Sequence, residues 1–147
     1  VLKEIDLTNN QLKKLENNFN RVVFVKKILF KNNQIDQIHS EFFDKLRFLD
    51  LLDLSINRIN NLNESTFSQL IHLKYLNLSH NQIDHVYRKH FLNLKNLAIL
   101  DLSRNQIREI EEFTFFNLGS LEQVYLDSNR ELFINNQINN TNENNSN

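Results

Sequence analysis

The sequence predicts a right-handed, curved α/β solenoid with a parallel β-sheet on its concave face. The first observation behind this prediction is an Asn that recurs every 23 or 24 residues, at Asn10, Asn33, Asn57, Asn81, Asn105 and Asn129. The second is a Phe at constant 24-residue spacing, at Phe19, Phe43, Phe67, Phe91 and Phe115. Two series that stay in phase over most of the chain indicate a structural repeat.

The clearest unit is LAILDLSRNQIREI, residues 97–110. Between Ile99 and Leu102 apolar side chains alternate, which predicts a strand with Leu100 and Leu102 inward and Ile99 and Asp101 outward. One coil cannot bury its own apolar residues, so successive coils must stack and their strands must pair in parallel. We expect short helical or irregular segments around the Phe positions, on the convex side.

The repeated Asn follows each strand, where the chain must turn. A buried turn leaves backbone N–H and C=O groups without water, and an amide side chain can both donate to and accept from them. We therefore predict that the Asn side chains in phase with the core point inward, and that these residues are not merely ordinary turn formers. They are Asn33, Asn57, Asn81, Asn105 and Asn129.

This pattern resembles the leucine-rich repeat family, in the 24-residue subclass common in animal extracellular proteins, from Val1 to about Leu132. We expect residues 1–132 to form about six repeats. LFINNQI at Leu132–Ile138 matches LFKNNQI at Leu29–Ile35 in six of seven positions. Residues 133–147 are therefore interpreted as a degenerate repeat remnant and an Asn-rich disordered tail.

Composition excludes several classes of function. The formal net charge is −1 and the pI about 6.6, which argues against nucleic-acid binding. Lys26, Lys27 and Lys31 are interpreted as solvated rather than as an anion site. No apolar run could span a membrane, and no Cys is present. We expect no signal peptide in this sequence, because it starts directly inside the first repeat without a charged segment followed by an apolar one. We expect a fragment of an extracellular or cell-surface ectodomain; the alternative is a cytoplasmic protein.

The sequence gives no sign of catalysis. One glycine cannot build a phosphate loop, a dinucleotide-binding motif or a nucleophile elbow. Metal binding is not expected at the five histidines, because they are not spaced as ligands; these are His39, His72, His80, His85 and His90. We predict no enzyme activity, no cofactor and no metal.

The concave face is the candidate binding surface, because the core does not fix its residues. We predict an apolar column of Leu51, Tyr75 and Ile99, extended by Leu29 at one end and Tyr125 at the other. Beside it lie a polar column of Asp53, Asn77 and Asp101, and the strand exits Ile56, His80 and Arg104. An apolar stripe with a polar rim is typical of a protein interface, although scattered exposed apolar residues are also normal.

Four Asn-x-Ser/Thr sequons are candidates for N-glycosylation, at Asn63, Asn77, Asn139 and Asn144. A glycan on Asn77 would cover the predicted stripe, whereas one on Asn63 would not. The resemblance implies a non-catalytic module of a Toll-like or leucine-rich immune receptor or secreted protein, with a protein or peptide ligand. Two alternatives stay open: adhesion or matrix organisation by homotypic association, including contact through uncapped ends, and a cytosolic scaffold or inhibitor.

Overall fold

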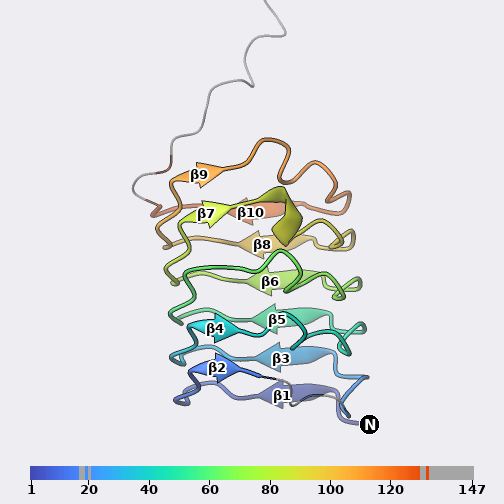
Figure 1. The fold of residues 1–147 in the computed structure, drawn as a ribbon. Helices are drawn as coiled ribbons and strands as arrows, with labels where there is room; N and C mark the ends of the chain where they lie inside the picture. Colours follow the sequence, from blue (N-terminus) through green and yellow to red (C-terminus); the bar gives the residue numbers. More distant parts are fainter. Residues whose placement is uncertain (17–18, 20, 130–131, 133–147) are drawn as a thin grey trace, which may run out of the picture.

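The computed structural model describes residues 1–16, 19, 21–129 and 132. Their main feature is a six-stranded parallel sheet with the strand order β1-β3-β5-β6-β8-β10 (Figure 1). The strands are β1 (Glu4–Asp6), β3 (Lys27–Leu29), β5 (Leu51–Asp53), β6 (Tyr75–Asn77), β8 (Ile99–Asp101) and β10 (Gln123–Tyr125). Each coil adds one strand, which confirms the predicted solenoid. The predicted tail, with the sequons at Asn139 and Asn144, lies outside the described residues.

Two shorter ladders lie on the opposite side of the coils, where the chain returns in the reverse direction (Figure 1). In the first, β2 (Lys14–Leu15) pairs with β4 (Gln37–Ile38); in the second, β7 (His85–Val86) pairs with β9 (Glu109–Ile110). Both are parallel. The third coil, which runs from β5 to β6, contributes no strand to either ladder, so β4 and β7 are not joined by a strand between them.

The convex segments are turns rather than α-helices. Leu46, Leu70 and Leu94 each donate a backbone hydrogen bond to the Phe three residues before, at 2.9 to 3.0 Å. Within the described residues the one helix is η1 (Arg88–His90), a single 3₁₀ turn. Each segment has only a few residues between the Phe and the next strand, too few to offset the cost of nucleating an α-helix.

The core consists of rows of identical or similar side chains, one from each coil. The inward positions of the four inner strands are fully buried, whereas those of β1 and β10 are only partly buried. Phe43, Phe67 and Phe91 of the Phe series are also fully buried. Phe19 and Phe115 are only partly buried, because they stand at the two ends of the Phe series and each lacks a stacked Phe on one side. The stacking of coils, rather than any single coil, therefore makes the core.

The repeated Asn side chains connect neighbouring coils. Asn81 Nδ2 donates to the carbonyls of Leu78 in its own coil and Leu54 in the preceding coil, both at 3.0 Å. Its Oδ1 accepts the N–H of Ile59 at 3.0 Å. The same bridge recurs at Asn33, Asn57, Asn105 and Asn129, which all have exposed fractions of 9% or less. Asn10 differs: it is exposed, and its hydrogen bonds among the described residues stay within the first coil.

The residue before each repeated Asn has left-handed backbone, with φ between 53° and 60°. These residues are Asn9, Asn32, Ile56, His80, Arg104 and Ser128. Asn adopts this conformation more readily than most residues, whereas a β-branched side chain is strained there. Ile56 is therefore the least favourable residue of this series.

Candidate functional site

The strand register places the predicted surface residues in columns across the main sheet. Leu51 pairs with Tyr75 and Tyr75 with Ile99, so these half-buried side chains are direct neighbours. The second column is formed in the same way by Asp53, Asn77 and Asp101. Ile56, His80 and Arg104 are exposed at the turns that follow the strands.

The predicted extension of the apolar column is wrong. Leu29 pairs with Asp53 and Tyr125 pairs with Asp101, so both belong to the second column. The neighbours of the apolar column are instead Lys27 at one end and Gln123 at the other. Alternate residues of a strand share a face, so a shift of two residues keeps a side chain outward but moves it to the other column.

The polar column also stabilises the turns. Oδ1 of Asp53, Asn77 and Asp101 accepts the backbone N–H two residues later, at 2.9 Å in each case. The donors are Ser55, Ser79 and Ser103, which are buried. These three surface side chains therefore have a structural role independent of any ligand.

Tyr75 is the centre of the surface. Burial raises the pKa of its phenol, and the negative charges of Asp53 and Asp101 raise it further. Asn77 Nδ2 lies 3.4 Å from the Tyr75 hydroxyl and donates to it. Tyr75 thus presents a neutral aromatic ring between two carboxylates, a setting that favours apolar and cationic groups of a partner.

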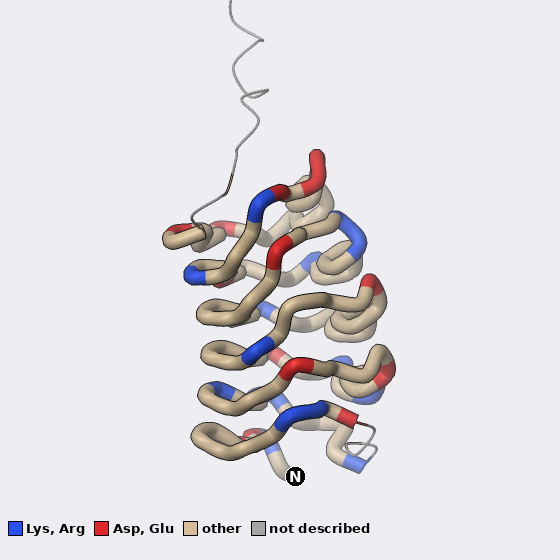
Figure 2. Tube along the Cα trace, turned by 60° about the vertical axis from the view of Figure 1, so that its left-hand side comes forward, with Lys and Arg blue, Asp and Glu red and all other residues tan. Residues whose placement is uncertain are grey.

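The lysines beside this surface form ion pairs with acidic side chains. Lys26 Nζ lies 3.3 Å from Asp50 Oδ2, and Lys27 Nζ lies 2.9 Å from Glu4 Oε1. Figure 2 shows basic and acidic residues interspersed along the coils. The lysines at 26 and 27 therefore do not form a concentrated anion site.

A row of exposed rings at the turns before the strands was not predicted. Phe24 stacks on Phe48 with ring centroids 5.5 Å apart, and Phe48 on His72 at 5.6 Å. Phe24 and Phe48 are 59% and 38% exposed. The signal was present in the sequence, since these three residues are spaced by 24 like the two series of the repeat.

The described residues contain no group of three or more His, Cys, Asp and Glu side chains placed to hold a metal ion. His90 is buried on the convex side, while His39, His72 and His80 are exposed on different turns. No helix in the described part of the chain is long and apolar enough to cross a membrane.

Comparison with protein families identifies a matching family model. The family model described as leucine rich repeat matches residues 25–83 and 71–130, which together include most of the chain. No curated protein sequence matches significantly.

Solved structures give several similar chains. A chain from the Toll–Spatzle complex of Drosophila is 25% identical with a TM-score of 0.78, and covers 85% of this chain. A chain from the complex of TLR13 with ssRNA13 is 35% identical with a TM-score of 0.73, and covers 82%. A chain from the LRIM1/APL1C complex is 26% identical with a TM-score of 0.77, and covers 81%. The alignments span only 20%, 17% and 22% of those chains, respectively.

Proposed function

Since this chain belongs to the leucine-rich repeat family, we propose that it is a non-catalytic module that binds a protein or peptide through the concave face of its main sheet. The observation that carries this proposal is the column of Leu51, Tyr75 and Ile99. Parallel strands lie about 4.8 Å apart, so the three side chains form a continuous apolar stripe about 10 Å long. Such a stripe with a polar rim has the anatomy of a protein interface.

The charges beside the stripe define the chemistry of the partner. Asp53 and Asp101 flank Tyr75 from the neighbouring strands. Two carboxylates would repel a phosphate backbone, whereas a Lys or Arg could pair with either one and lie over the ring. We therefore expect a polypeptide segment with apolar side chains and at least one basic residue.

We further propose an extracellular setting, as part of a receptor or a secreted recognition protein of innate immunity. Support comes from the similarity to the Toll–Spatzle and LRIM1/APL1C structures, both of which are complexes of named proteins. The chain spans about a fifth of those chains. Additional repeats in a longer protein would extend the sheet on either side of the stripe.

The test is affinity capture of secreted proteins by the wild-type chain and by the double variant Tyr75→Glu with Ile99→Asp. The variant should fold, because both side chains are half-buried on the outer face of the sheet, and it should lose the partner. The matched control replaces two exposed rings on another side, Phe113→Asp with Phe116→Glu. A partner retained by the first variant and lost by the control would contradict the proposed surface.

A further inference from the structure

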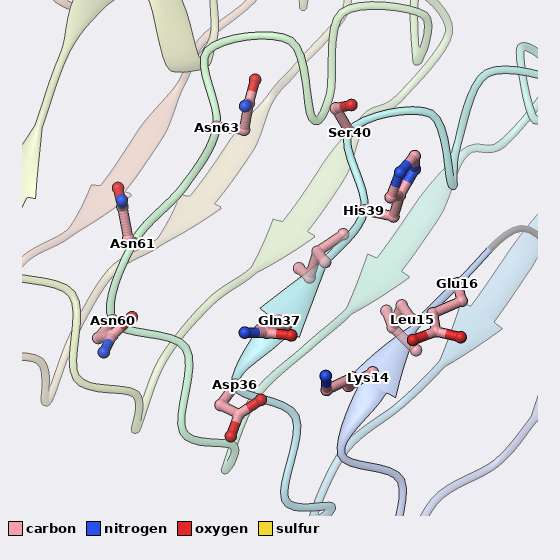
Figure 3. Close-up of a pocket in the computed structure, with 11 residues that line it drawn as sticks. Lys14, Leu15, Glu16, Asp36, Gln37, His39, Ser40, Asn60, Asn61 and Asn63 are labelled. Atoms are coloured by element: carbon pink, nitrogen blue, oxygen red, sulfur yellow. The ribbon is translucent and has the colours of Figure 1, made fainter.

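A polar hollow lies on the side of the solenoid opposite the main sheet (Figure 3). Its volume is about 550 Å³, within the range of about 300–1,000 Å³ typical of small-ligand pockets. One wall is the ladder of β2 and β4 with the residues that follow each strand; the other is the third coil. Hydrogen-bonding side chains line both walls, among them Gln37, His39, Asn60, Asn61 and Asn63.

The hollow exists because the third coil leaves the short ladder. Up to Ile59 this coil stays in register, since Arg58 donates to the Ile35 carbonyl at 2.9 Å. Residues 60–63 then donate no backbone hydrogen bond to β4. In the second coil, the residue equivalent to Asn63 is His39, which bonds to the preceding coil through the Leu15 carbonyl at 2.9 Å. The third coil therefore opens a gap where its neighbours pair.

Asn63 stands at the rim of this hollow and begins the sequon Asn63-Glu64-Ser65. Its Oδ1 accepts from the Ser65 N–H at 3.0 Å and from the Ser65 hydroxyl at 2.8 Å. Its Nδ2 makes no hydrogen bond among the described residues. Both Asn63 and Ser65 are exposed. The nitrogen that a glycan would modify is therefore accessible.

Asn77 is the opposite case. It lies within β6, between β5 and β8, and its Nδ2 already donates to the Tyr75 hydroxyl. The hydroxyl residue of its sequon, Ser79, is buried with an exposed fraction of 7%. A glycan on Asn77 would stand in the centre of the proposed binding surface.

We propose that Asn63 carries an N-linked glycan, that Asn77 does not, and that the first N-acetylglucosamine residues lie in the hollow. The amides of Gln37, Asn60 and Asn61 offer donors and acceptors for sugar hydroxyl and acetamide groups. The rest of the glycan would project away from the main sheet. This inference rests on the extracellular setting proposed above.

The modification is a group transfer from an activated, lipid-linked diphospho-sugar. Asn63 Nδ2 forms a bond to the anomeric carbon of the sugar and loses one proton. The bond between that carbon and the diphosphate oxygen breaks, and the lipid diphosphate leaves with the electron pair. No oxidant or reductant is required.

The first test is glycan occupancy, measured by peptide mass spectrometry on the full chain expressed behind a secretory leader in animal cells. We expect Asn63 to be modified in the wild type, in Ser79→Ala and in Ser65→Thr, and unmodified in Ser65→Ala. Secreted, folded protein with a bare Asn63, or with a glycan on Asn77, would overturn the assignment. Because Ser65 is remote from the main sheet, the Ser65→Ala variant should still bind the partner. Glycan occupancy at Asn63 and partner binding at the main sheet can therefore fail independently of each other.

The second test is contact between sugar and hollow. Isotope-labelled acetamide methyl groups of the glycan should give nuclear Overhauser effects to the side chains of Ile38 and His39. The double variant Gln37→Ala with Asn61→Ala should lose these signals while Asn63 stays modified. A fully modified wild-type protein without such signals would refute docking in the hollow.

Discussion

Replacing Asn81 by Ala should reveal how strongly the repeated Asn holds neighbouring coils together. The substitution leaves the buried N–H of Ile59 without its acceptor, at a cost of about 1–3 kcal/mol. The carbonyls of Leu54, Leu78 and Ser79 lose one donor each, but each keeps another hydrogen bond. The loss of these three hydrogen bonds from Asn81 adds a net cost of about 0.5–1.5 kcal/mol in total. We therefore expect the free energy of unfolding to fall by about 3 kcal/mol.

The assay is urea denaturation followed by far-ultraviolet circular dichroism, with the midpoint shifted and the slope unchanged. Asn10→Ala is the matched control, because Asn10 has the same place in its repeat but is exposed and, among the described residues, bonds only to its own coil. It should cost less than about 1 kcal/mol. Equal losses in the two variants would refute the view that coil-to-coil bridging, rather than local turn formation, is the role of this Asn.

Three further predictions follow from single residues. Ile56→Asn should raise the free energy of unfolding by about 1 kcal/mol, because Asn tolerates the left-handed backbone that strains Ile56; Ile56→Val should bring no gain in the same denaturation assay. Burial lowers the pKa of His90 below its ordinary 6.5, so protonation of this side chain favours the unfolded chain. The stability contributed by neutral His90 should therefore be complete above pH 6.5. It should decline as pH falls through the lowered folded-state pKa. His90→Gln should remove this part of the pH dependence in thermal melts, and an unchanged dependence would assign it elsewhere. Ultraviolet titration should find the Tyr75 phenol ionising above its ordinary pKa, and Asp53→Asn should bring it down; no change would show that Asp53 has no effect on it.

Much of the fold could be predicted because each repeat imposes the same physical demands. Alternating apolar residues before each Asn determined the strands, and the in-phase Asn and Phe series determined the stacking. The columns Leu51–Tyr75–Ile99 and Asp53–Asn77–Asp101 follow directly from constant 24-residue spacing. The same spacing should have excluded Leu29 from the apolar column, because Leu29 precedes its repeated Asn by four residues, as Asp53 does, whereas Leu51 precedes its own by six.

The hollow could not be predicted in this way. Asn60 and Asn61 occupy positions whose equivalents in the second coil, Asp36 and Gln37, are equally polar. Polarity therefore does not distinguish the second coil, which pairs in the short ladder, from the third coil, which does not. That choice depends on packing between coils. The surface stripe is likewise a three-dimensional feature, whose binding role depends on a partner that composition cannot identify.

The proposed function requires that the concave face around Tyr75 contacts the partner. The most direct measurement places a photoreactive phenylalanine analogue at position 75 and, in a separate chain, at position 116, then irradiates each with secreted proteins and identifies the adducts. We expect a specific adduct from position 75, none from position 116, and loss of the adduct when Ile99→Asp is added. Adducts only from position 116 would contradict binding at the concave face and would move the binding surface to the opposite side of the solenoid.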